Sequence, residues 1–132
     1  MRTKNGIAIL MYLMASSSIA FAQQIRLNVL DFGASNDAQV LSTTSIQLAI
    51  DSCYRIGGGV VQIPEGEFMT GTIVLKDNVT LLLDSGATLH ASPNLQDYKA
   101  PLQDAVRPTL IYANGAENIG ISGKGEIQGD AK

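Results

Sequence analysis

The chain after Gly59 is a series of short β-prone runs separated by tight breaks, and this pattern restricts the possible folds more than any other feature. The breaks contain glycine, proline, asparagine or aspartate, which favour turns. A stretch from Ser92 to Pro108 holds three of the four prolines and is predicted to be a long loop. No second helical period appears. The predicted strands are Val60–Ile63, Thr72–Leu75, Val79–Leu83, Ala87–Leu89, Leu110–Tyr112, Ile119–Ile121 and Glu126–Gln128.

A faint internal repeat suggests how these strands are arranged. The segment Asp77-Asn78-Val79-Thr80-Leu81 recurs further along the chain as Glu117-Asn118-Ile119-Gly120-Ile121. An asparagine that recurs at the start of a short strand indicates stacked coils with asparagine at a turn, each coil burying its apolar side chains against its neighbours. An antiparallel sandwich is the alternative that the pattern leaves open.

One amphipathic helix precedes the strands. Ile46, Ala49, Ile50 and Cys53 follow helical spacing and form one apolar stripe, so the lone cysteine is expected to be buried and inert. Thr44 and Gln47 have the spacing of a capping box, and Gly57 stands where a left-handed C-cap is expected. Because a stack of coils exposes an apolar end, this helix is predicted to cap the N-terminal end.

Positions 1–22 have the three parts of a secretory signal: the basic residues Arg2 and Lys4, an apolar run over 7–14, and a small-residue site ending at Ala22. We expect cleavage after Ala22 and a secreted or periplasmic product, with residues 23–132 forming one incomplete domain. A short membrane anchor is the alternative. Since Arg2 and Lys4 leave with the signal, the mature chain holds seven basic and twelve acidic residues, a net charge of −5 with no basic cluster. Neither nucleic acid nor, after signal removal, a membrane is therefore an expected partner.

Several short motifs follow one another in order along residues 27–129. They are Asp31-Phe32-Gly33-Ala34, Ala49-Ile50-Asp51, Ile63-Pro64-Glu65-Gly66, Thr70-Gly71-Thr72-Ile73-Val74, Leu83-Asp84-Ser85-Gly86-Ala87 and Ile119-Gly120-Ile121-Ser122-Gly123. Together they resemble the pectin-lyase-like superfamily and, within it, glycoside hydrolase family 28, the polygalacturonases. The resemblance implies an all-β fold, a right-handed single-stranded parallel β-helix of which this chain forms the N-terminal coils and the capping helix. It also implies pectic polysaccharide as the substrate of the intact protein.

The residues that the resemblance would assign to catalysis are absent. Inverting hydrolysis needs two carboxylates about 6.5–9.5 Å apart, which the family supplies from an Asn-Thr-Asp motif and an Asp-Asp pair, with a Gly-His-Gly histidine and an Arg-x-Lys pair beside them. None of these motifs occurs in the sequence, and the family's usual Asp-Gly after the last strand is Gln128-Gly129 here. We therefore predict no catalytic, cofactor-binding or metal-binding residue in this chain, and a structural or solvent-facing role for His90.

Three interpretations of function remain open at this stage. The first is the N-terminal segment of a polygalacturonase-like glycosidase, inactive alone. The second is a non-catalytic β-solenoid module that binds carbohydrate or belongs to a tailspike-like assembly, and the third is a short protein that works through a partner chain that completes the helix. Few aromatic residues, which sugar-binding surfaces commonly use, argue against the second interpretation. An uncapped C-terminal end predicts self-association. Asn78 lies in an Asn-x-Thr sequence that fits a glycosylation acceptor. Its expected place at a solenoid turn is the simpler explanation for an asparagine at this position.

Overall fold

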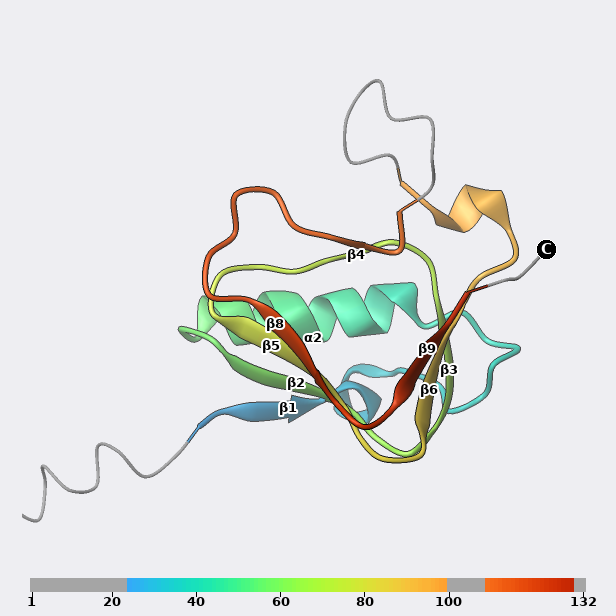
Figure 1. The fold of residues 1–132 in the computed structure, drawn as a ribbon, viewed down its shortest axis with the longest axis horizontal. Coiled ribbons are helices and arrows are strands. Elements are labelled where there is room, and N and C mark those ends of the chain that lie inside the picture. The colour runs from blue at the N-terminus through green and yellow to red at the C-terminus, as the bar shows by residue number, and fades with distance from the viewer. Residues whose placement is uncertain (1–23, 100–108, 130–132) are drawn as a thin grey trace, which may run out of the picture.

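Parallel strands stacked in successive coils make up the fold. The computed structural model describes residues 24–99 and 109–129, and the predicted signal peptide lies outside them. Every strand pairing in these ranges is parallel, which excludes the antiparallel sandwich (Figure 1). One sheet contains β1 (Arg26–Asn28), β2 (Gly59–Ile63), β5 (Val79–Leu83) and β8 (Gly120–Gly123); a second contains β3 (Gly66–Thr70), β6 (Ala87–Ala91) and β9 (Glu126–Gln128); a third contains β4 (Ile73–Val74) and β7 (Ile111–Tyr112).

The strand register aligns apolar side chains into columns inside the coils. Val61, Leu81 and Ile121 form one column, and Phe68, Leu89 and Ile127 form another. Since successive residues of a strand point to opposite faces, the residues between them face outward. Val61, Leu81, Phe68 and Leu89 are fully buried, so the core runs along the axis of the stack.

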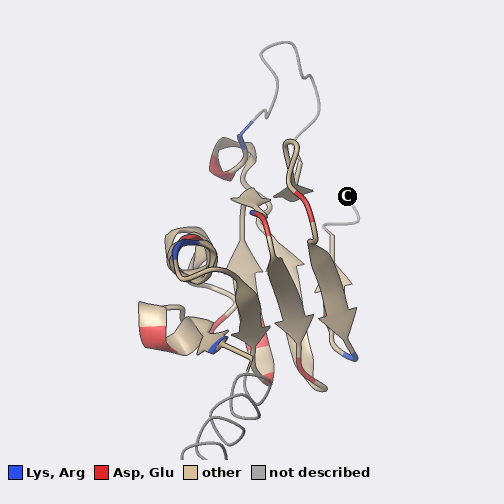
Figure 2. Cartoon of the chain, turned by 90° about the vertical axis from the view of Figure 1, so that its left-hand side faces the viewer, with Lys and Arg blue, Asp and Glu red and all other residues tan. Residues whose placement is uncertain are grey.

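Helix α2 (Thr43–Arg55) lies at the N-terminal end of the stack, with the last coil at the other end (Figure 2). The predicted apolar stripe is confirmed, because Ile46, Ala49, Ile50 and Cys53 are completely buried. Gly57 follows the helix with a φ of 102°, as the predicted C-cap requires.

The predicted capping box at the start of α2 is wrong. The residue before the helix is Ser42, whose side chain makes no capping hydrogen bond. Gln47 instead exchanges two hydrogen bonds with the backbone of Val74, at 2.7 and 3.0 Å, and donates to Asp51. The Gln47 side chain therefore makes a tertiary contact with β4 instead of the capping contact that its spacing from Thr44 predicted.

The repeated asparagines stack on each other, as the sequence repeat suggested. Asn78 and Asn118 both adopt left-handed backbone conformations, with φ of 65° and 56°. The side-chain amide of Asn118 donates to Oδ1 of Asn78 at 3.0 Å. Gly58 occupies the same turn one coil below, and a Cβ there would lie 2.4 Å from Cβ of Asn78. Asparagine tolerates this conformation better than other non-glycine residues, which explains its recurrence.

The coils differ in length. Gly59 pairs with Val79, whereas the next residue along β5, Thr80, pairs with the much more distant Gly120. Most of the additional residues of the longer coil lie between β6 and β7, where the predicted loop contains the short 3-10 helix η2 (Leu95–Asp97). A second 3-10 helix, η1 (Val29–Phe32), follows β1 and packs against α2. Within the described ranges, no helix has the length and apolar character needed to cross a membrane.

Candidate functional site

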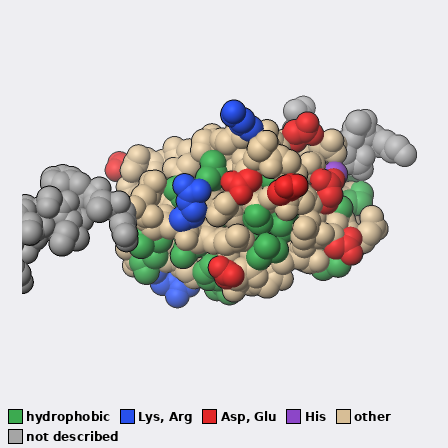
Figure 3. Space-filling model, turned by 90° about the horizontal axis from the view of Figure 1, so that it is seen from below, with side chains coloured by type: hydrophobic (Ala, Val, Ile, Leu, Met, Phe, Trp, Pro, Cys, Tyr) green, Lys and Arg blue, Asp and Glu red, His purple; other side chains and the backbone are tan. Residues whose placement is uncertain are grey.

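The outer face of the β3–β6–β9 sheet carries a row of polar side chains. Alternation along each strand turns Phe68, Leu89 and Ile127 inward and their neighbours outward. Figure 3 shows acidic side chains next to the single histidine on the molecule's lower side. The outward residues are Glu67 and Met69 on β3, Thr88 and His90 on β6, and Glu126 and Gln128 on β9.

His90 is paired with a carboxylate on the neighbouring strand. Its Nε2 atom lies 2.8 Å from Oε1 of Glu67. This hydrogen bond, assisted by a weaker one from Thr88, holds the pKa of the exposed Glu67 carboxyl below its usual value. The structural role predicted for His90 is consistent with this pairing, which links β3 to β6 on the outer surface.

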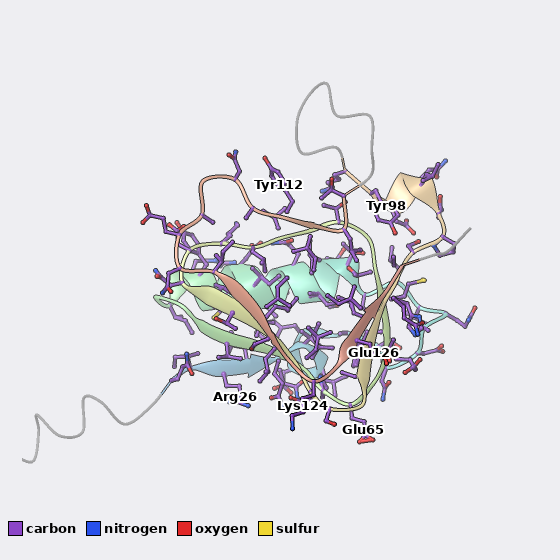
Figure 4. All side chains as sticks on the ribbon, viewed as in Figure 1. Arg26, Glu65, Tyr98, Tyr112, Lys124 and Glu126 are labelled. Carbon is purple, nitrogen blue, oxygen red and sulfur yellow. The ribbon has the colours of Figure 1, made fainter. Side chains whose placement is uncertain are left out.

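A groove of about 630 Å³ lies over this face beside the loop that follows β6. The side chains of Met69, His90 and Gln128 come from three different strands and form its floor. Figure 4 shows Glu126 on β9 and Tyr98 at the end of η2. The described residues that line the groove are Ala38, Gln39, Met69, His90, Ala91, Ser92, Pro93, Asn94, Asp97, Gln128 and Gly129.

The wall of the groove is held in place by its own hydrogen bonds. The hydroxyl of Ser92, which is 3% exposed, donates to the Asp97 carboxylate and accepts from the backbone N–H of Asn94 at 3.1 Å. The Tyr98 hydroxyl donates to the Ser92 carbonyl at 2.7 Å, and Asn94 caps η2 by accepting from the N–H of Gln96. The loop therefore presents a preformed surface.

A second hollow of about 490 Å³ lies between α2 and β4, and several of its polar side chains make contacts within the fold. Lys76 forms an ion pair with Asp51 at 3.0 Å and lies over the ring of Tyr54, 5.6 Å from its centre. Gln47 bonds the backbone of Val74. These contacts attach the helix to the sheet.

The titratable side chains of the described groove lining, His90 and Asp97, already have partners within the fold. Among residues 24–99 and 109–129, no group of three or more His, Cys, Asp or Glu side chains could hold a metal ion. Glu67 accepts from His90, and Asp97 accepts from Ser92, so the carboxylates nearest the groove are used in the fold. Cys53 is buried in the helix face, and burial raises the pKa of its thiol, which keeps it protonated and unreactive.

Sequence reasoning singled out His90 but missed Gln39, Asn94, Asp97 and Gln128 as parts of one groove. Strand alternation places Met69, His90 and Gln128 on outward faces, but only the register shows that they are neighbours. The loop residues carry no motif that marks them. The predicted cleavage site at Ala22 falls outside the described residues.

The architecture and the polar outer face define a parallel β-helix protein of the type found among polysaccharide-active enzymes. No family model matches the sequence. An exo-poly-α-D-galacturonosidase of Dickeya chrysanthemi is 36% identical over 118 residues, covering 79% of this chain and 19% of that protein. The family 28 exopolygalacturonase of Yersinia enterocolitica superimposes with a TM-score of 0.71 at 38% identity, covering 82% of this chain and 21% of that one.

The chain is thus polygalacturonase-like, with a pectin-lyase-like fold, and it spans about a fifth of the length of these relatives. A mannuronan C5-epimerase of Azotobacter vinelandii is 44% identical over 62 residues, which is 41% of this chain and 11% of that protein. Since proteins named for different reactions share this stretch, the shared residues specify the fold rather than the reaction.

Proposed function

We propose that this chain is the N-terminal segment of a secreted glycoside hydrolase that acts on pectic polysaccharide, and that the segment has no hydrolytic activity alone. The likeness to an exo-poly-α-D-galacturonosidase and an exopolygalacturonase supports the substrate class. The missing carboxylate motifs support inactivity, since inverting hydrolysis requires a general acid and a general base placed across the scissile bond. The signal-like residues 1–22 support secretion or delivery to the periplasm.

The observation that carries this proposal is the difference between the two ends of the stack. Leu81 and Leu89 are fully buried, whereas Ile121 and Ile127, in the same columns one coil later, are 48% and 42% exposed. At the other end, α2 buries its apolar face, and we assign it the role of a cap on a right-handed β-helix. The last coil therefore suits further coils of the same kind, on which the catalytic carboxylates would lie.

The hydrolytic part of the proposal is tested by incubating the mature chain with polygalacturonate and measuring the release of reducing ends. No release above the background is expected. Measurable hydrolysis that disappears on heat denaturation would show that the described surface is catalytic, and the scaffold role would be abandoned.

The open end also predicts the behaviour of the isolated chain. With no further coil, we expect marginal folding, poor solubility and self-association through Ile121 and Ile127. Sedimentation should show a concentration-dependent species that the double variant Ile121→Ser/Ile127→Ser reduces, while the outward substitution Ser122→Ala leaves it unchanged. A cooperative melt of a monomer at all concentrations would contradict this expectation.

A further inference from the structure

The groove over the β3–β6–β9 face has an unusual charge for a surface that meets an acidic polysaccharide. Its described lining residues include the carboxylate of Asp97 and the imidazole of His90, but no lysine or arginine. Glu67 and Glu126 stand on the same outer face, on the two strands that flank β6. Within the described residues, the carboxylates of Asp97, Glu67 and Glu126 therefore lie at the groove or on the same sheet face, without a lysine or arginine in the lining.

Among the described lining residues, a free uronate would find no positive partner that is not already used. Nε2 of His90, the one titratable nitrogen donor of the described lining, lies 2.8 Å from the Glu67 carboxylate. Binding would strip water from the uronate carboxylate without giving it a charged partner, which costs free energy. The neighbouring carboxylates of Asp97 and Glu67 would also repel it. The groove consequently discriminates against the ionised acid.

An uncharged pyranose suits the same surface well. The side-chain amides of Gln39, Asn94 and Gln128 supply both donors and acceptors for sugar hydroxyls. Met69 and Pro93 supply apolar contact for the carbon-bound hydrogens of a ring. Because the Ser92 hydrogen bonds already order the wall, little conformational entropy is lost on binding.

We propose that this groove is a subsite for an uncharged pyranose unit, either a neutral sugar or an esterified uronate, and that it selects against free uronate. The proposal rests on the proposed function, since it assumes that the chain meets pectic polysaccharide. It adds that the first coils recognise the uncharged portions of that polymer.

Matched ligands test the proposal, because trigalacturonate and its methyl ester differ in charge but share the same rings. Binding to the mature chain is followed by NMR at pH 7 in trimethylamine N-oxide, which favours the folded state, with far-UV circular dichroism as a check on folding. The ester should bind at least about tenfold more tightly than the acid, a difference of about 1.4 kcal/mol, and should shift the amide signals of Asn94 and Gln128. A neutral galacto-oligosaccharide shows whether the ester group itself is required.

Two charge variants distinguish an effect of charge in the groove from an effect of the net charge of the chain. Gln128→Lys places a cation in the groove and should reduce the ratio of ester affinity to acid affinity. Ser122→Lys adds the same charge on the neighbouring sheet of the same coil and should leave that ratio unchanged. Equal or tighter binding of the acid by the unaltered chain, or no saturable binding of any ligand to the folded chain, would overturn the proposal. Neither result affects the proposal that the segment is inactive alone, which the assay on polygalacturonate tests separately.

Discussion

Leu81 and Ile121 occupy the same inward column in consecutive coils, so shortening each to alanine measures how much the open end weakens the stack. Leu81 is completely buried between Val61 and Ile121, whereas Ile121 is 48% exposed. Leu81→Ala leaves an enclosed cavity and should cost about 3 kcal/mol, within the range of about 2–5 kcal/mol for such changes. Ile121→Ala loses roughly half the transfer free energy and leaves no enclosed cavity, so we expect about 1 kcal/mol.

Urea unfolding followed by far-UV circular dichroism measures the difference. With a slope of about 2 kcal/mol per molar, the midpoint should fall by about 1.5 M for Leu81→Ala and about 0.5 M for Ile121→Ala. Failure of Leu81→Ala to fold where Ile121→Ala folds agrees with the reasoning. Equal costs that do not depend on protein concentration would refute it, because Ile121 would then be as well packed as Leu81. Equal costs that appear only at high concentration would locate Ile121 in an interface between copies.

Three further predictions concern the turn, the surface pair and the cysteine. Gly57 and Gly58 both have left-handed backbone conformations, but an added Cβ meets nothing within 4 Å at Gly57 and lies 2.4 Å from a neighbouring side chain at Gly58. In urea titrations, Gly57→Ala should therefore lower the free energy of unfolding by about 1 kcal/mol and Gly58→Ala by clearly more. Equal losses would contradict the close contact at Gly58. Because the pKa of Glu67 is lowered in the fold, its contribution to stability is present above the unfolded-state pKa of about 4.3 and is lost as pH falls through the folded-state pKa. His90→Ala should raise the folded-state pKa of Glu67, as measured by carboxyl NMR, and an unchanged titration would exclude the pairing. Cys53 should react with a thiol reagent only on unfolding, so rapid modification of the native chain would show that the helix face opens.

The helix and the stacking could be predicted because each leaves a local record in the sequence. The apolar stripe through Ile46 and Cys53 follows from helical spacing, and the recurrence of Asn78 and Asn118 reflects a backbone conformation that few residues tolerate. The capping box failed because Gln47 is drawn to the backbone of Val74, which is distant in sequence. Spacing alone cannot reveal such competition.

The groove could not be predicted because it depends on register. Met69, His90 and Gln128 are far apart in the sequence, and only the parallel pairing of β3, β6 and β9 makes them neighbours. The wall residues lie in a loop without hydrophobic periodicity, so their hydrogen bonds leave no pattern in the sequence. Sequence analysis therefore described the scaffold more fully than the surface that the scaffold carries.

The unequal lengths of the coils have an evolutionary consequence. The short coil that joins Gly59 to Val79 and the long coil that joins Thr80 to Gly120 align in the same sheet, although the long coil has many more residues, most of them in the connection between β6 and β7. The entropic cost of closing a loop rises only slowly with its length, so insertions at this corner should lower the stability of the core only slightly. The same corner carries Asn94 and Asp97, which form one wall of the groove. Descendants of such a chain can therefore reshape what they recognise by changing loop length and composition here, while the inherited columns of buried side chains stay intact.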